Sequence, residues 1–495
     1  MKKILIFFLV LFIATEVSFA QSKTPYQISV DVQSKRIDSL QTLLKKDKPD
    51  TNKVNNLNAL AKELWYSKTD TVIILGNQAL SLAEKLQWKK GIANSLGNLG
   101  VYNHINGDYT NALDFYLKAL KLDEELNNKI GISKRLNNIG VTYMNQGNYP
   151  KALDYYFKAL KIDEELSDKN AIAIQLRNIA ELYYHQADYP KVLDYYSKAL
   201  KIYEELKDKQ GISDCYSYIG SIYMNQGNYP EALKNYFAAL KISEETKDKS
   251  AIANCYSSIG MVYQAQRNYS EALKNYFAAL KISEELKDKS GISSCYNIIG
   301  MVYQEQGNYP EALNNFFIAL KVFEELKDKR GIFSCYNSIG IVYYMQGNYS
   351  EAVKIYFDAL KISEELKDKR GISNGYVNIG MGYAAQSNYP EALKYYFSAL
   401  KISEELKDKE GISYCHINIG HVYASLHNYS EALKNCFAAL KIKEEMEDKR
   451  GISTCYQSIG ILYEAQGNYS ESLKNYFAAL KVTEGMEGNG GTSYY

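Results

Sequence analysis

The segment KISEELKDKSGISSCYNIIGMVYQEQGNYPEAL, residues 281–313, decides the fold because it recurs with small changes along most of the chain. Aligned on the Gly-Ile or Ala-Ile pair in its middle, full 40-residue units begin at 91, 131, 171, 211, 251, 291, 331, 371, 411 and 451. A degenerate unit occupies about 51–90, where only the second half keeps the pattern. Repeats of this length are typical of solenoids, in which each unit buries its apolar surface only against its neighbours.

The first half of each unit predicts a helix, as the unit 291–330 shows. Its apolar residues recur at the i, i+3, i+4, i+7 spacing of one helical face. Gln306-Gly307-Asn308 ends this helix, and Gly307 suits the left-handed conformation that often follows a helix. The apolar stripe consists of Ile292, Cys295, Tyr296, Ile299, Gly300 and Tyr303.

The second half of the unit predicts another helix, with a broad apolar face. Pro310 favours its first turn, where the missing N–H costs nothing. We expect the apolar face to end at Leu326 and Asp328 to cap the next helix. Glu324, Glu325, Lys327 and Lys329 are interpreted as a solvated, charge-balanced end. The apolar face consists of Ala312, Leu313, Phe316, Phe317, Ala319, Leu320, Val322 and Phe323.

Two columns of small residues predict close packing between these helices. A glycine column runs from Gly140 to Gly460, and an alanine column runs from Ala159 to Ala479. The equivalents of Tyr143 fill the space between, so the large tyrosine count of 46 is interpreted as packing and not as a cofactor site.

Composition and charge narrow the class of protein. The chain has 495 residues, of which 46% are hydrophobic and 23% are charged, and these values fit a folded protein and exclude bulk disorder. Lys and Arg total 58 against 57 Asp and Glu, a net charge of +1. This balance argues against nucleic acid or an anionic membrane as the main partner.

The N-terminus predicts a cleaved secretory signal over residues 1–20. Lys2 and Lys3 precede an apolar run from Ile4 to Ala14, and Ser18-Phe19-Ala20 places small residues at the cleavage site. An uncleaved anchor is the alternative. We expect an exported protein, in the periplasm or at the cell surface or outside the cell, that does not span a membrane after cleavage. Residues 21–50 are expected to cap the first unit.

Seven cysteines and three neighbouring histidines are candidates for chemistry. Six of the cysteines, from Cys215 to Cys455, are separated by multiples of 40, which is too far for disulfides between stacked helices, so we interpret them as small buried side chains. His416, His421 and His427 occupy different helical columns and are not expected to share a metal. The chain carries no recognisable catalytic motif, so we expect no enzyme activity, cofactor or metal.

The unit resembles the tetratricopeptide repeat. In the unit 131–170 the matching residues are Leu136, Ile139, Gly140, Tyr143, Ala152, Tyr156 and Ala159. The longer 40-residue unit is similar to the extended repeats of Pins-type spindle adaptors and kinesin light chains, and to exported sensor regions of bacterial signalling proteins. The family's late proline is absent here, and Glu164 stands in its place. The resemblance implies a right-handed superhelical α-solenoid, an all-α fold of helix-turn-helix repeats over 91–486, that binds protein with its concave side.

Six positions of the first helix lie outside its buried stripe and vary between units. Counting the Gly-Ile start as position 1, they are positions 4, 7, 8, 11, 14 and 15. Position 8 is Asn in five units, and a carboxamide can both donate to and accept from a peptide backbone. The resemblance supports such a role for the Asn ladder, and the alternative is that these residues are only polar surface. The candidate residues are Asn98, Lys134, Asn137, Asn138, Asn145, Arg177, Asn178, Tyr184, His185, Tyr218, Asn225, Asn374, Asn378 and Asn418.

The function predicted from these features is a non-catalytic scaffold that binds a protein or an extended peptide. The alternative is a sensory input module of a bacterial signalling system whose output domain is separate or lost. Residues 487–495 resemble the start of a truncated further repeat, so the last apolar face lacks a visible polar cap. Self-association through that end is a further prediction.

Overall fold

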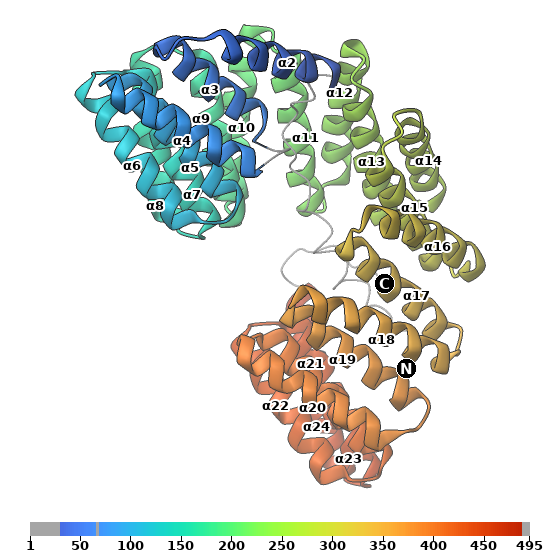
Figure 1. The fold of residues 1–495 in the computed structure, drawn as a ribbon. Coiled ribbons are helices and arrows are strands. Elements are labelled where there is room, and N and C mark those ends of the chain that lie inside the picture. The colour runs from blue at the N-terminus through green and yellow to red at the C-terminus, as the bar shows by residue number, and fades with distance from the viewer. Residues whose placement is uncertain (1–29, 66–68, 488–495) are drawn as a thin grey trace. The chain divides into compact units, whose positions relative to one another are not determined.

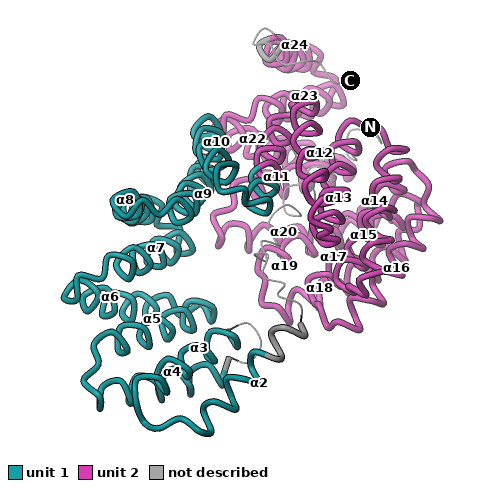
Figure 2. The backbone as a smooth tube through the Cα atoms, turned by 90° about the horizontal axis from the view of Figure 1, so that it is seen from above, with its two compact units in different colours: residues 1–215 teal, residues 216–495 magenta. Residues whose placement is uncertain are grey.

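The computed structural model describes residues 30–65 and 69–487, and every regular element within these ranges is an α-helix. The chain divides into two compact units, residues 1–215 and 216–495, which are described separately (Figure 2). Unit 1 holds α2 (Val30–Lys46), α3 (Thr51–Glu63), α4 (Thr69–Lys85), α5 (Lys89–Ile105), α6 (Tyr109–Glu125), α7 (Lys129–Asn145), α8 (Tyr149–Glu165), α9 (Lys169–His185) and α10 (Tyr189–Leu206). Helix α11 (Lys209–Asn225) crosses the division.

Unit 2 continues the same alternation of helices. It holds α12 (Tyr229–Thr246), α13 (Lys249–Ala265), α14 (Tyr269–Glu285), α15 (Lys289–Glu305), α16 (Tyr309–Leu326), α17 (Lys329–Met345), α18 (Tyr349–Leu366), α19 (Lys369–Ala385), α20 (Tyr389–Leu406), α21 (Lys409–Ser425), α22 (Tyr429–Glu445), α23 (Lys449–Ala465) and α24 (Tyr469–Glu487). Odd-numbered helices from α5 are the first helices of the repeats, and even-numbered helices from α6 are the second helices.

Within each unit, a helix packs mainly against the helices next to it in the sequence (Figure 1). The core clusters of unit 2 each join the second helix of one repeat to the first helix of the following repeat. In one such cluster, Tyr276 and Leu280 of α14 pack with Cys295 and Ile299 of α15. The predicted all-α solenoid of helical hairpins is therefore confirmed.

The predicted helix ends are confirmed in the repeat 291–330. Gly307 has a φ of +75°, Pro310 lies in the first turn of α16, and the Asp328 carboxylate accepts from the backbone N–H groups of Arg330 and Gly331. One end was not predicted. Lys327 follows α16 with a φ of +56°, a left-handed conformation that glycine usually supplies.

The glycine column is explained by the aromatic ring that faces it. A Cβ atom added to Gly140 would lie 2.7 Å from ring carbons of Tyr156, which is too close for an unshifted ring. The ring of Tyr156 is fully buried. The two helices of a repeat therefore approach each other through this contact, as the small-residue column predicts.

Two predicted core residues of α16 are not buried. Phe317 is 45% exposed and Leu326 is 40% exposed, so their assignment to the buried face was wrong. The physical reason is that the neighbouring helices cover only part of the surface of α16, and these two positions lie outside the covered part. Conversely, Ser293 and Val302 of α15 are fully buried although they lie outside the predicted stripe. First helices are packed on more sides than one amphipathic stripe indicates.

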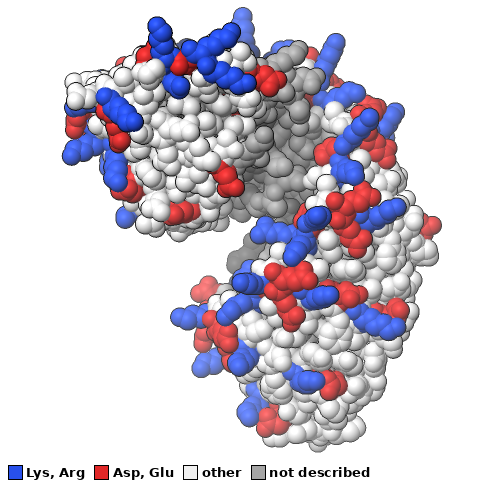
Figure 3. Space-filling view, viewed as in Figure 1, with Lys and Arg blue, Asp and Glu red and all other residues white. Residues whose placement is uncertain are grey.

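Exposed ion pairs connect the start of a first helix to the end of the second helix of the same hairpin. Lys289 Nζ at the start of α15 lies 2.7 Å from Glu325 Oε2 at the end of α16, and Lys329 pairs in the same way with Glu365. The charge-balanced end predicted from sequence is therefore a series of specific pairs. Charges of both signs lie side by side on the face shown in Figure 3.

The two chain ends carry predictions that lie outside the described residues, namely the signal over 1–20 and the tail from 488. Helix α2 packs Ile37, Leu40 and Leu44 against the cluster formed by α3 and α4. Among the described helices, none combines the length and the apolar character needed to cross a bilayer.

Candidate ligand-binding face

The candidate site is the surface formed by positions 4, 7, 8, 11, 14 and 15 of the first helices, which we name the first-helix face. In unit 1, α5 contacts α7 and α7 contacts α9. In unit 2, α15 contacts α17 and α19 contacts α21. Because neighbouring first helices touch, side chains at these positions lie close enough to bond from one repeat to the next.

Asparagines of the ladder in unit 1 bond to other asparagines of the neighbouring repeat. Asn98 Nδ2 donates to Asn58 Oδ1 at 2.9 Å, and Asn178 Nδ2 donates to Asn137 Oδ1 at 2.7 Å. Asn137 also donates weakly to Asn138 Oδ1 at 3.4 Å. Each carboxamide has two N–H groups and two acceptor lone pairs, so these bonds leave capacity for a ligand.

A histidine lies within the same face. His104 Nδ1 lies 3.0 Å from Thr142 Oγ1, and its Nε2 lies 3.0 Å from Asn145 Nδ2. Burial lowers the pKa of His104, which favours the neutral ring. Because both ring nitrogens have partners in the next repeat, the polar groups of His104 and Asn145 hold α5 and α7 together.

Arg177, a charged candidate of unit 1, and Glu181 lie on α9. Arg177 Nη1 lies 3.4 Å from Asp214 Oδ2. Burial opposes the charge of Arg177, but Asp214 and Tyr203 outweigh it and raise its pKa. Burial raises the pKa of Glu181, while His185 and Arg177 limit that rise.

Other candidates of unit 1 present aromatic rings and an exposed cation. The ring of His185 stacks on Tyr149 with centroids 5.7 Å apart and an interplanar angle of 8°. Tyr184 meets Tyr189 edge to face at 6.1 Å. Lys134 is exposed on α7.

The candidates in unit 2 divide between exposed and internal positions. Tyr218 and Asn225 are exposed on α11. Asn374 is half-buried, and Asn378 Nδ2 donates to Asn337 Oδ1 at 3.3 Å. Asn418 is only 7% exposed and donates to the Tyr414 carbonyl at 2.9 Å, so its carboxamide nitrogen is used within its own helix.

Part of the face in unit 2 is filled by neighbouring repeats, which the sequence did not indicate. Ile341, Val377 and Met381 are buried although they occupy the variable columns. Tyr414 Oη lies 3.6 Å from Met381 Sδ in the preceding repeat. Burial raises the pKa of Tyr414 to about 12. The sequence signal for this contact is Tyr414 itself, because the other units carry smaller residues at position 4.

The cysteines and histidines considered for chemistry are spread through the repeats. All seven thiols are buried and free, as predicted for small packed side chains. Burial raises the pKa of the Cys335 and Cys415 thiols to about 12, which disfavours the thiolate. His416 bonds to Asn435, and His427 bonds to Tyr429. Residues 30–65 and 69–487 contain no group of His, Cys, Asp or Glu arranged to hold a metal ion.

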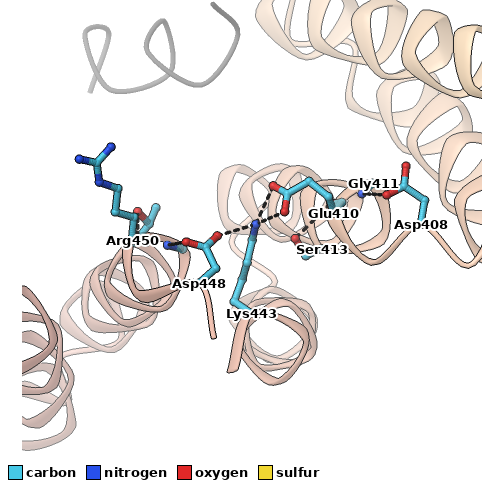
Figure 4. A network of polar contacts seen from close by, with 9 residues as sticks. Asp408, Glu410, Gly411, Ser413, Lys443, Asp448 and Arg450 are labelled. Atoms are coloured by element: carbon cyan, nitrogen blue, oxygen red, sulfur yellow. Dashed lines mark hydrogen bonds and ion pairs between the residues drawn. The ribbon is translucent and has the colours of Figure 1, made fainter. Parts of the chain in front are cut away.

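A buried cation on α22, which bonds to the start of α21 and to the residue that caps α23, was missed. The Lys443 side chain is 3% exposed, and its Nζ lies 2.6 Å from both Glu410 carboxylate oxygens and 2.9 Å from Asp448 Oδ2 (Figure 4). Burial opposes the charge of Lys443, but these two carboxylates outweigh it and raise its pKa. Asp448 also caps α23 by accepting from the Gly451 N–H at 2.9 Å.

The fold and this face define a helical-hairpin solenoid of the kind built from tandem repeats. The tetratricopeptide repeat family model matches residues 132–205, 213–285, 292–365, 371–445 and 416–484, and a second model of the same description matches 93–126. These matches span well over half of the sequence. The chain therefore belongs to the tetratricopeptide repeat family.

Solved structures share the fold at low sequence identity. A Signal Transduction ATPase with Numerous Domains protein with a tetratricopeptide repeat sensor, from Pyrococcus horikoshii, is 17% identical with a TM-score of 0.52, over 87% of this chain and 72% of that chain. Aspartyl phosphate phosphatase F from Bacillus subtilis is 15% identical with a TM-score of 0.48, over 76% and 94%. The apo quorum sensor NprR from B. thuringiensis is 16% identical with a TM-score of 0.48, over 75% and 98%. No curated protein sequence matches this chain.

Proposed function

We propose that the chain is a non-catalytic scaffold that binds a protein or an extended peptide on its first-helix face. The observation that carries the proposal is that core positions largely keep the same residue from repeat to repeat, while positions of the first-helix face do not. Core positions such as those of Gly140 and Tyr156 repeat along the chain, whereas the first-helix face changes from repeat to repeat and keeps half-exposed carboxamides. Packing sets the identity of the first group, and the second group is free to suit a partner.

The inter-repeat asparagine bonds support a rigid binding surface. The bond from Asn178 to Asn137 fixes both carboxamides before any ligand arrives. Pre-ordered side chains lose less conformational entropy on binding than free ones. An extended peptide would then bond to the oxygen and second N–H that Asn178 retains.

The test is capture of partner proteins from an envelope extract with the wild-type chain and with Asn138→Ala/Asn178→Ala. We expect the double variant to stay folded and to lose the captured partner. Asn314→Ala, an exposed change on the second helix α16, is the matched control and should retain it. Equal capture by all three proteins would remove the asparagine mechanism.

The sensory-module alternative and export remain predictions that share this binding step. A membrane kinase or regulator that co-purifies with the chain would favour the sensory role. Export rests on residues 1–20, and mass spectrometry of the N-terminus in the producing cell would show whether they are removed.

A further inference from the structure

The first-helix face of unit 2 is almost without charge. Five repeats, from 251 to 450, supply thirty positions to this face, and Glu305 is the one Asp, Glu, Lys or Arg among them. At the 23% charge of the whole chain, about seven would stand there if exposure alone set the composition. The outer side of the second helices in the same repeats is highly charged, as Glu271, Lys274 and Lys281 of α14 illustrate.

Glu305, the single charged residue on the first-helix face of these five repeats, is bonded within the protein. Gln264 Nε2 donates to Glu305 Oε1 at 2.8 Å, and Gln264 Oε1 accepts from Tyr276 Oη at 2.9 Å. Burial raises the pKa of Glu305, while hydrogen bonds from Gln264 and Tyr269 limit the rise. Glu305 is thus engaged by its neighbours and is not an open anionic site.

The neutral groups on this surface are suited to a polypeptide. The side-chain carboxamides of Asn254, Gln304 and Asn374 have no hydrogen-bond partner within residues 30–65 and 69–487, so these carboxamides are open to a ligand. The same face also carries half-buried apolar side chains, which pack against the core clusters and keep part of their surface accessible. These apolar residues are Met261, Ile298, Met301 and Ile417.

We infer that the first-helix face of unit 2 binds an uncharged polypeptide segment, with aliphatic or aromatic side chains against the Met and Ile residues and its backbone on the free carboxamides. This inference rests on the proposed function and adds the chemistry of the ligand. A charged ligand side chain placed here would lose water without meeting a counter-charge, which weakens its binding. Methionine adapts its shape to different apolar partners.

The experiment is selection of a displayed library of random dodecapeptides on the full chain, followed by titration of a selected, fluorescently labelled peptide. We expect enriched sequences that are apolar and carry no more than one net charge. Their affinity should change less than about twofold between about 50 and 500 mM NaCl, because salt screens only charged contacts.

Two matched variants separate this inference from the proposed function. Ser294→Glu/Ser334→Glu adds charge to half-buried positions of the face, and Asn314→Glu adds charge to the exposed outer side of α16. We expect at least a tenfold loss of affinity for the first variant and an unchanged affinity for the second, with both melting like the wild type.

Each other outcome overturns a stated claim. Enrichment of peptides with three or more net charges, whose salt-sensitive binding is still lost in Ser294→Glu/Ser334→Glu, would refute the neutral ligand and keep the binding face. Selected peptides that bind both variants equally, or a library that yields no binder, would refute the inference and count against the peptide-binding function as well.

Discussion

Arg135 Nε lies 3.1 Å from Asp123 Oδ2, and both side chains are buried where α6 meets α7. Arg135 also donates to the Ala93 carbonyl at 3.2 Å and to Asn94 Oδ1 at 3.3 Å. In later repeats the same two positions hold smaller pairs, such as Ser243 with Cys255. The contact between a second helix and the following first helix therefore uses the same two positions along the chain, but the residues at these positions differ.

A double-mutant cycle tests whether Asp123 and Arg135 act as a pair. Asp123→Ser should cost about 3–5 kcal/mol, because it leaves a buried guanidinium without its counter-charge. The double variant Asp123→Ser/Arg135→Cys reproduces a pair found elsewhere in the chain and should be less destabilised than the sum of the single changes, by about 1–3 kcal/mol. Urea unfolding, with hydrogen exchange at α6 and α7 as a local readout, measures the cycle. Additive effects would show that the pair is not coupled.

The turn between the two helices of a repeat offers a second prediction. Arg267 and Ser387 adopt φ values of +58° and +60° at the position where Gly307 and its equivalents stand. A side chain in this conformation costs about 1–2 kcal/mol, so Arg267→Gly and Ser387→Gly should each raise the stability by up to about 1 kcal/mol after the entropy of glycine is counted. Thermal unfolding checks the shift.

The reverse change is the control for this turn. Gly307→Ala should lower the stability by about 1 kcal/mol, because no contact surrounds a Cβ atom there and only the backbone conformation is strained. A stabilising Gly307→Ala, or a destabilising Arg267→Gly, would contradict the explanation.

The fold could be predicted almost entirely from sequence, because a 40-residue period repeats every packing signal many times. Gly307, Pro310 and Asp328 each mark a helix end by their local backbone chemistry, and no distant contact decides them. Phe317 was misplaced because apolar character alone does not show how far the neighbouring helices cover a second helix.

The candidate face was less predictable, because its hydrogen bonds depend on the spacing between repeats. The partner of Asn178 is Asn137, one unit away and offset by one position, which a column alignment does not reveal. Lys443 stands in the column that holds Phe323 in the repeat 291–330, and its partner Glu410 is 33 residues earlier. Only the stacking of α21, α22 and α23 brings these groups together.

The Lys443 cluster predicts a specific dependence of stability on pH. Burial favours protonation of Asp448, but hydrogen bonds from Gly451 and Lys443 outweigh it and lower its pKa. A lowered pKa adds stability above the ordinary Asp value, about 3.9, and this stability is lost as the pH falls through the lowered value. The raised pKa of Lys443 adds stability below about 10.4, which is lost as the pH rises through the raised value.

Lys443→Ser should therefore destabilise the chain by about 1–3 kcal/mol at pH 7, because charged hydrogen bonds are lost. The difference from the wild type should shrink below about pH 4, where the Asp448 contribution begins to be lost. Lys441→Ser removes the same charge from an exposed position and should have little effect at either pH. Thermal unfolding at pH 7 and pH 3 checks both variants, and an equal Lys443→Ser effect at the two values would reject the mechanism.

The last repeat allows a test of how contacts between neighbouring repeats contribute to the stability of the solenoid. Leu480 of α24 is 51% exposed, whereas its equivalents from Leu240 to Leu440 are 6–9% exposed, since a following first helix covers each of them. A depression of about 470 Å³, lined by Ile461, Tyr476, Leu480 and Thr483 among others, lies on this uncovered side. Position in the stack, and not residue type, sets the burial of this leucine.

The same substitution at two equivalent positions should consequently change the stability by very different amounts. Leu320→Lys places a charge among the buried side chains between two repeats and should lower the free energy of unfolding by about 3 kcal/mol or more. Leu480→Lys should leave the melting temperature nearly unchanged. Sedimentation of the wild type and Leu480→Lys adds a readout on association. If two copies pair through α24, the wild type should sediment as a dimer and Leu480→Lys as a monomer. A wild type that stays monomeric at high micromolar concentration excludes that pairing. Equal destabilisation by both lysines would mean that α24 is covered in solution as fully as the internal helices.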